Sequence, residues 1–295
     1  MEITIVENDA GQRLDRFLRK AFKATPLSLI HKALRKGRVK VNGKRGKGEQ
    51  PLVAGDVITA SDIDFRRLVT ITEKVAEYSE DLSPLILFEN DRFIVVNKPV
   101  GLPVHPGAFH HGDTLIDLIQ RHLKHNDGSL SFSPSLAHRL DKGVSGAILA
   151  CKAADALRLA TEHFRENNIR KEYLAIVGGE IFVDEGFIDT PLEDKKGNML
   201  ESQTKWRVVE RLKDCTLLRV RLLTGRMHQI RRHLSGEGLP IIGDTEYGGR
   251  KAIRIMLHSH LLEFKDTLTG KKISVEAPMP DEMKAFVQRC RPISG

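Results

Sequence analysis

The chain has 295 residues, of which 40% are hydrophobic and 29% are charged. These values are typical of a folded protein with a sizeable core and exclude a largely disordered chain. No apolar run approaches the roughly 20 residues that span a bilayer, and the N-terminus lacks the pattern of a signal peptide. The three cysteines, Cys151, Cys215 and Cys290, form no CxxC pair, which favours reduced thiols and a cytoplasmic protein.

The formal charge of +8 is concentrated near the N-terminus. Residues 1–60 hold 13 Lys/Arg and 6 Asp/Glu, a net of +7 (13 − 6), so the rest of the chain nets only +1 (8 − 7). The stretch 31–47 holds eight basic residues and no acidic one. Such a patch favours a nucleic-acid partner over a merely solvated surface, and Lys36, Arg38 and Lys40 are candidate contacts.

Residues 1–65 are predicted to form a small domain with two helices and a hairpin. Apolar residues at helical spacing indicate one helix over 12–20 and a second that ends at Gly37. The segment RVKVNGKR predicts a hairpin that turns at Asn42-Gly43, and VAGDVITA predicts a further strand. The polar stretch 66–84, which includes a Ser-Pro pair, is typical of a linker.

The remainder, residues 85–295, is predicted to be a strand-dominated α+β domain. Strand-like segments alternate with amphipathic helices, and no internal repeat is visible. The expected strands are LILFEND, RFIVVNK, GAILACK, EYLAIV, KWRVVERL, CTLLRVRLL, IRIMLHSHLLEF and KKISVEAP, and the expected helices are DTLIDLIQRHLK, AADALRLATEHFREN and GRMHQIRRHLSG.

Several histidines raise the question of a metal site, but their pattern argues against one. His110-His111 sits in a glycine-rich loop, and His258 and His260 share one face of an expected strand. Neither pair has an HExxH motif, a cysteine pair or an acidic cluster nearby, and His228 and His233 do not share a helical face. The glycine-rich motifs of nucleotide sites are absent as well. We therefore expect no metal and no other cofactor.

Six blocks of sequence follow one another in a fixed order and are too specific to be ordinary turns. The blocks are NKPVGLPVHPG (97–107), HRLDKGVSG (138–146), KEYLAIV (171–177), TGRMHQIRRHL (224–234), GLPIIGDTEYG (238–248) and LHSHLLEF through APMP (257–280). With these blocks the chain resembles the RluA-type family of RNA pseudouridine synthases over nearly its whole length. The N-terminal module resembles the small RNA-binding domain of these enzymes, most closely in the branch that acts on large-subunit ribosomal RNA.

The resemblance implies a fold and a reaction. The fold is α+β, with a mixed, mostly antiparallel sheet in the catalytic domain and a small α/β RNA-binding domain before it. The reaction converts uridine in folded RNA to pseudouridine: the glycosidic bond to nitrogen is cut, the uracil turns, and carbon-5 joins the sugar. It uses no metal or cofactor. The implied partner is RNA, ribosomal first and transfer RNA second, and the expected state is a monomer.

The resemblance also assigns roles to residues. Asp141 is the catalytic carboxylate, which attacks the anomeric carbon or assists formation of a glycal. Arg226 is the arginine that pairs with it, and Tyr173 stacks on the uracil or, second, moves the carbon-5 proton. Arg139 fills the gap left by the flipped uridine.

Two further residues of these blocks are candidate RNA contacts. His138 touches the flipped nucleotide or braces its loop. Arg231 contacts a phosphate or faces solvent.

One departure and two alternatives accompany this interpretation. Val144 stands where the family usually has threonine, so one hydrogen bond of roughly 0.5–1.5 kcal/mol is missing from the loop. The first alternative is a non-catalytic RNA-binding or ribosome-assembly protein on the same fold. The second is a carboxylate-dependent glycosidase acting on free nucleosides or sugars, which has little use for the basic N-terminal module.

Overall fold

The computed structural model describes residues 2–22, 25–60, 81–106, 113–123, 129–266 and 268–291. The chain divides into two units, each with its own sheet. Unit 1 comprises Met1–Glu80, Ile119–Pro134 and Lys152–Asp155, and unit 2 comprises Asp81–Leu118, Ser135–Cys151 and Ala156–Gly295. Most of the predicted linker lies outside the described residues, as does His110-His111.

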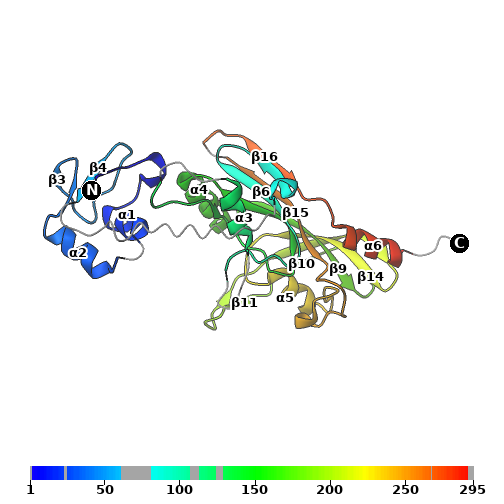
Figure 1. The fold of residues 1–295 in the computed structure, drawn as a ribbon. Coiled ribbons are helices and arrows are strands. Elements are labelled where there is room, and N and C mark those ends of the chain that lie inside the picture. Colours follow the sequence, from blue (N-terminus) through cyan, green and yellow to red (C-terminus); the bar gives the residue numbers. More distant parts are fainter. Residues whose placement is uncertain are drawn as a thin grey trace. The chain divides into compact units, whose positions relative to one another are not determined.

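Unit 1 is a small sheet with two helices (Figure 1). Its antiparallel strands follow the order β1-β4-β2-β3, and Asn42 and Gly43 turn the β2–β3 hairpin with φ values of 50° and 76°. Phe17, Ile30 and Ile58 lie in its apolar core. The elements are β1 Glu2–Thr4, α1 Leu14–Ala21, α2 Leu27–Arg35, β2 Val39–Val41, β3 Lys44–Arg45 and β4 Val57–Ala60.

Unit 1 also contains a segment that the sequence analysis assigned to the second domain. The carboxylate of Asp9 is 1% exposed and accepts hydrogen bonds from the Ser129 hydroxyl at 2.7 Å and the Leu130 amide at 3.0 Å. The amide and hydroxyl of Ser131 donate to it as well, at 3.0 Å and 2.6 Å. A buried carboxylate with four donors is well satisfied, so it fastens residues 129–131 within unit 1.

Unit 2 is built on a ten-stranded sheet. Eight of its strands follow the order β10-β13-β14-β9-β15-β8-β6-β5, and the other two, β16 and β7, pair with β15 and β8. Only β8 and β15 pair in parallel among the described strands, so the predicted mixed, mostly antiparallel α+β fold is confirmed. The strands are β5 Ile86–Glu89, β6 Phe93–Lys98, β7 Ser135–Leu136, β8 Ser145–Cys151, β9 Arg170–Gly178, β10 Glu185–Ile188, β13 Thr204–Leu212, β14 Cys215–Leu222, β15 Leu257–Lys265 and β16 Lys272–Glu276.

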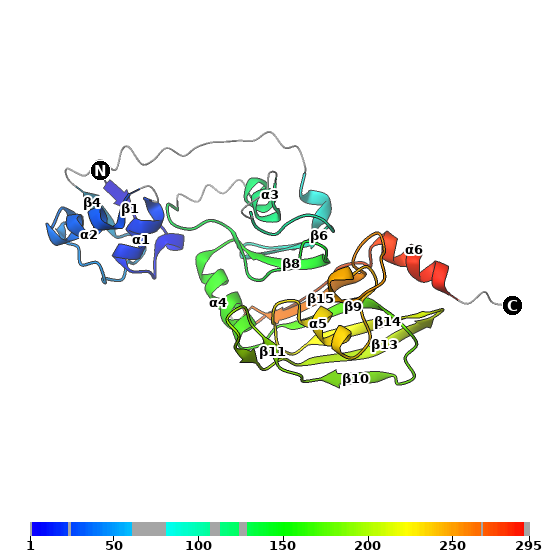
Figure 2. The ribbon, with the colours of Figure 1, turned by 90° about the horizontal axis from the view of Figure 1, so that it is seen from below.

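Helices accompany this sheet, and Figure 2 shows α5 over the strands β9, β14 and β13. Strand β8 is buried at every position, as a strand covered on both faces should be. The helices are α3 Leu115–His122, α4 Ala154–Arg165, α5 Gln229–Gly236 and α6 Asp281–Cys290. None of the described helices combines the length and apolarity needed to cross a bilayer.

Candidate active site

Asp141 lies in the turn between β7 and β8. The amide of Val144 donates to the carbonyl of Asp141 at 3.0 Å, which closes the turn. The side chain of Val144 is 3% exposed, so it packs inward, whereas that of Asp141 is 34% exposed. The turn is therefore held to the protein by Val144, while the carboxylate of Asp141 remains accessible to solvent.

Gly146 explains the glycine at the end of the HRLDKGVSG block. Its φ is +113°, and a Cβ there would lie 2.2 Å from the carbonyl oxygen of Ser259 on β15. The parallel pairing of β8 with β15 therefore requires glycine at this position. This close approach of two backbones fixes where the Asp141 turn leaves the sheet.

Arg231, in the first turn of α5, forms the ion pair with Asp141. Its Nη1 is 3.1 Å from Oδ2 of Asp141. The same guanidinium donates to both oxygens of Asp244, at 2.6 Å and 2.7 Å, and to Glu246 at 2.7 Å. Arg231 is only 5% exposed, so it is a buried cation surrounded by three carboxylates. The sequence analysis expected Arg231 to contact a phosphate or to face solvent. In the structure its guanidinium is instead buried and paired with carboxylates.

The prediction that Arg226 pairs with Asp141 is corrected by the structure. Arg226 is exposed, and its Nε donates to the carbonyl of Glu201 at 3.0 Å. The reason is local: the predicted helix begins only at Gln229, because His228 has a left-handed backbone with φ of 53°. Arg226 therefore lies in the turn before the helix, and Arg231 projects from its first turn instead.

The carboxylates around Arg231 stabilise its positive charge. Although burial opposes its charge, hydrogen bonds with Asp244 and Glu246 raise the pKa of Arg231 above its ordinary value. The ring of Tyr247 adds a cation–π contact, with its centroid 4.7 Å from the guanidinium carbon. A guanidinium held on several sides presents Nη1 to Asp141 in one orientation.

His228 is a second neighbour of the carboxylate. Its Nε2 is 3.5 Å from Oδ1 of Asp141, and its Nδ1 is 2.9 Å from the hydroxyl of Tyr247. Sequence reasoning assigned no role to His228, Asp244, Glu246 or Tyr247. Asp244, Glu246 and Tyr247 could have been found from their place in the GLPIIGDTEYG block, to which the sequence analysis gave no chemical role.

Tyr173 lies on β9 beside this cluster and is 6% exposed. Burial raises the pKa of its phenol to about 12; a hydrogen bond with Ser259 opposes the shift, and the charge of Asp141 adds to it. A phenol with so high a pKa is a poor proton acceptor at neutral pH. The site therefore favours Tyr173 as a packing surface, with its hydroxyl directed at Ser259.

His138 and Arg139 are adjacent in sequence but face different surroundings. The ring of His138 stacks on Phe164 with centroids 4.6 Å apart, and its Nε2 accepts from the Leu149 amide at 3.0 Å. Burial lowers its pKa to about 3, so the ring is neutral. This placement favours the second of its two predicted roles, bracing of the loop. Arg139 is exposed.

Behind the Asp141 turn lies a buried lysine that sequence reasoning did not single out. Lys98 is 0% exposed and donates to the carbonyls of Pro99 and Leu102 at 2.9 Å and of Lys142 at 3.4 Å. Burial and the charge of Arg254 lower its pKa to about 8, while Asp141 opposes the shift. Lys98 therefore ties the end of β6 to the residue that follows Asp141.

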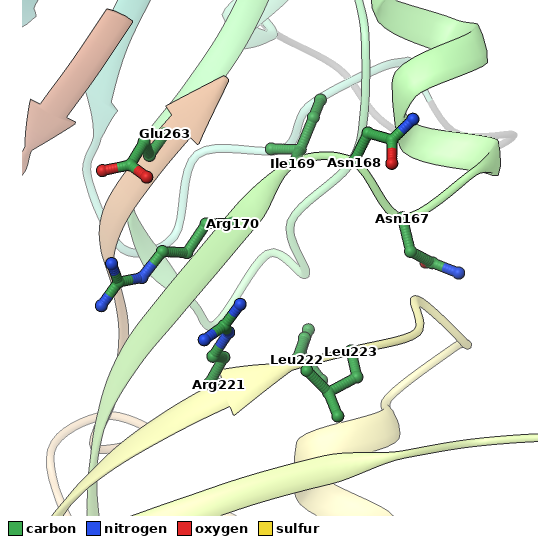
Figure 3. A pocket seen from close by; sticks show the side chains of 8 residues that line it. All are labelled: Asn167, Asn168, Ile169, Arg170, Arg221, Leu222, Leu223 and Glu263. Carbon is green, nitrogen blue, oxygen red and sulfur yellow. The ribbon is translucent and has the colours of Figure 1, made fainter. Parts of the chain in front are cut away.

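A pocket on the other face of β9 is separate from this site (Figure 3). Arg170, Arg221 and Glu263 project into it from β9, β14 and β15. Arg170 donates to Glu172 at 2.6 Å, so its charge is already neutralised. Tyr173, one residue beyond Glu172, points to the opposite face.

The predicted RNA contacts of unit 1 are all exposed. Lys36, Arg38 and Lys40 lie at the end of α2 and on β2 with their side chains in solvent. No ion pair involves them within the described part of unit 1. Their charges are free to meet an external anion.

Comparison with known families gives two matches. Residues 92–236 match the RNA pseudouridylate synthase family, and residues 12–58 match the S4 domain. The chain is 34% identical to ribosomal large subunit pseudouridine synthase C of Vibrio vulnificus (strain CMCP6), over 98% of this chain and 96% of that protein. It is equally similar, at 34% over the same shares, to the protein of that name from Escherichia coli (strain K12).

Solved structures show the same fold. Human RNA pseudouridylate synthase domain containing 1 aligns with a TM-score of 0.53 and 26% identity, over 70% of this chain and 94% of that one. Human RNA pseudouridylate synthase domain containing 4 aligns with a TM-score of 0.61 and 23% identity, over 71% and 94%.

Proposed function

We propose that this chain, which belongs to the RNA pseudouridylate synthase family and is therefore an RNA-modifying isomerase, acts on uridines of large-subunit ribosomal RNA. The relatives that match it end to end carry this substrate in their names. The S4 match and the exposed Lys36, Arg38 and Lys40 support an RNA bound through its backbone. We also propose a cytoplasmic location, which the unbridged Cys151, Cys215 and Cys290 support.

One observation carries the assignment of the catalytic group: Asp141 is a partly exposed carboxylate held by a buried arginine. Arg231 directs Nη1 to Oδ2 of Asp141 and leaves the carboxylate able to meet a ribose. In the proposed reaction Asp141 attacks the anomeric carbon, or assists formation of a glycal, as the bond from that carbon to N1 breaks. Carbon-5 of the uracil then bonds to the sugar and loses its proton, and N1 gains one, so the atoms balance.

We assign Tyr173 and Arg139 different roles because Tyr173 is buried beside Asp141 and Arg139 is exposed. A uridine must leave its stack for its sugar to reach Asp141, at a cost of a few kcal/mol. Tyr173, buried next to the carboxylate, offers an aromatic face to the extruded base. Arg139, exposed on the same loop, fills the gap in the RNA, where a guanidinium can both stack and hydrogen-bond.

The experiment is release of tritium from RNA transcribed with uridine labelled at carbon-5. The wild type and Asp141→Asn are compared on large-subunit ribosomal RNA, small-subunit ribosomal RNA and transfer RNA. We expect release from large-subunit RNA by the wild type alone, because asparagine lacks the carboxylate charge and nucleophilicity.

Other results would change the proposal at defined points. Release from transfer RNA alone would replace the substrate, and equal release by Asp141→Asn would remove the carboxylate from the chemistry. Tight binding of all three RNAs without release would favour the non-catalytic assembly protein. Activity on a free nucleoside after deletion of residues 1–65 would favour the glycosidase.

A further inference from the structure

Lys171 is a buried cation that has no task in the reaction described above. It lies near the start of β9 and is 4% exposed. Among the residues that the structure describes, none forms a hydrogen bond or an ion pair with its ammonium group. Burial lowers its pKa, and no neighbouring acid opposes that shift. An unpaired buried charge destabilises a folded protein, so its presence calls for a ligand.

The nearest carboxylate in the sequence cannot be its partner. Side chains alternate along β9, so Lys171 shares a face with Tyr173, while Glu172 points to the other face. There Glu172 accepts from Arg170 at 2.6 Å and from Arg219 at 3.4 Å. Figure 3 shows Arg170 on that second face, next to Arg221 and Glu263. The two basic residues therefore differ in their partners. Arg170 forms an ion pair with Glu172, whereas Lys171 forms none with the described residues.

The surroundings of Lys171 place it beside the loop that carries His138 and Asp141. Its Nζ is 5.6 Å from the ring centroid of Phe164, which also stacks on His138 of the catalytic loop. The charge of Lys171 contributes to the lowered pKa of His138. Nζ also lies 3.7 Å from the place where a Cβ on Gly225 would stand, and Gly225 is exposed. The ammonium thus lies just beneath an open surface of the Thr224–Arg226 turn.

We propose that Lys171 binds a backbone phosphate of the substrate RNA next to the target uridine. Lys171 and Tyr173 are two residues apart on one face of β9, so the cation and the base-stacking ring stand roughly 7 Å apart along the strand. Lysine binds phosphate as a compact point charge, and a dehydrated site strengthens that attraction. The inference rests on RNA being the substrate but not on which RNA it is.

The test measures binding and stability together. Wild type, Lys171→Met and Lys171→Arg are titrated with transcribed large-subunit ribosomal RNA at several salt concentrations. Loss of one phosphate contact should lower the slope of log affinity against log salt by about 0.7–0.9 and weaken binding at least tenfold at low salt. Lys171→Arg should keep the wild-type slope. Without RNA, Lys171→Met should melt at the wild-type temperature or above, because it removes an unpaired charge.

A matched control is Lys205→Met, since Lys205 is an exposed lysine on the nearby strand β13. A salt slope for Lys171→Met equal to the wild-type slope would overturn the proposal, as would a lower melting temperature with RNA binding unchanged. Lys171→Gln replaces the methionine variant if that one does not fold. Inorganic phosphate is titrated in parallel. If the wild type binds phosphate tightly and Lys171→Met does not, the site belongs to a small anion and the proposed RNA contact is overturned. Because RNA binding is measured without turnover, the salt dependence of the affinity tests the Lys171 contact even if the protein releases no tritium. Failure of this inference can therefore be told apart from failure of the proposed function.

Discussion

Arg231 holds Asp141 with the same guanidinium that binds Asp244 and Glu246, so a single buried cation orients three carboxylates. Because Asp244 and Glu246 hold the arginine from the other side, loss of the Asp141 charge does not release it. The groups that position the Asp141 carboxylate are therefore distinct from the carboxylate that we propose reacts. In the proposed reaction Asp141 supplies the chemistry, and Arg231, held by Asp244, fixes the position of that carboxylate.

Asp141→Asn should abolish tritium release while the protein stays folded. The amide preserves shape, and Arg231 keeps its bonds to Asp244 at 2.6 Å and 2.7 Å. We expect at least a thousandfold loss of rate, because an amide is neither charged nor nucleophilic enough to replace the carboxylate, and a melting temperature within a few degrees of wild type. A large fall in melting temperature would show that Asp141 is needed for folding and not only for turnover.

Arg231→Met and Arg226→Met form a matched pair, since both remove an arginine from one sequence block. Removal of Arg231 leaves buried Asp244 without its partner, so the free energy of unfolding should fall by about 3–5 kcal/mol. Removal of exposed Arg226 should change it by roughly 0.5 kcal/mol or less. Chemical denaturation measures both. Equal losses in the two variants would contradict the assignment of the ion pair to Arg231.

Tyr173→Phe should retain activity within roughly tenfold of wild type, because only one hydrogen bond, of about 0.5–1.5 kcal/mol, is lost. The pKa of about 12 makes the phenol an unsuitable base near neutrality. Tyr173→Leu should lose far more, since the aromatic face is gone. Single-turnover rates on saturating RNA separate these effects from binding. A phenylalanine variant as inactive as the leucine variant would give the hydroxyl a chemical role.

Acid should destabilise unit 2 through His258. Burial lowers the pKa of this histidine to about 4, and its ring bonds to the Ser145 hydroxyl at 2.8 Å. Below pH 6.5 the unfolded chain binds a proton that the folded chain excludes, so stability is present above pH 6.5 and is lost as the pH falls towards 4.

Between pH 7.5 and 5 the loss from His258 should be about 2 kcal/mol. Unfolding followed by the fluorescence of Trp206, the single tryptophan, measures it. His258→Gln should remove this part of the pH dependence, whereas His31→Gln, at an exposed position of unit 1, should not. An unchanged pH dependence in His258→Gln would assign the acid sensitivity to other groups.

Replacement of Lys36, Arg38 and Lys40 by glutamine should weaken RNA binding in a salt-dependent way. Three phosphate contacts on single-stranded RNA would lower the slope of log affinity against log salt by about 2. The rate at saturating RNA should not change, because Lys36, Arg38 and Lys40 belong to unit 1 whereas Asp141 belongs to unit 2. The control replaces three exposed lysines of unit 2, namely Lys195, Lys196 and Lys271. Equal effects of the two triple variants would mean that binding follows net charge alone.

The local elements of this protein could be predicted from sequence because their signals are local. Helical spacing indicated α1 and α2, the Asn42-Gly43 pair indicated the β2–β3 hairpin, and the expected strands of unit 2 were found. The order of the six blocks identified the family, which the comparisons confirm. Prediction was less accurate where a helix begins: the segment 225–236 is helical only from Gln229.

By itself, then, the sequence determined the family and most of the elements, and it singled out the loop that carries Asp141. Only the tertiary structure decided which arginine meets that carboxylate, because one left-handed residue, His228, moves Arg226 off the helix. It also decided that residues 129–131 belong with unit 1 through Asp9, and that Lys171 is buried with no hydrogen-bond or ion-pair partner among the described residues. Some of these relationships join residues that are far apart in the chain, and one depends on the backbone angle of a single residue. Neither kind of relationship can be read from the pattern of residue types along the sequence.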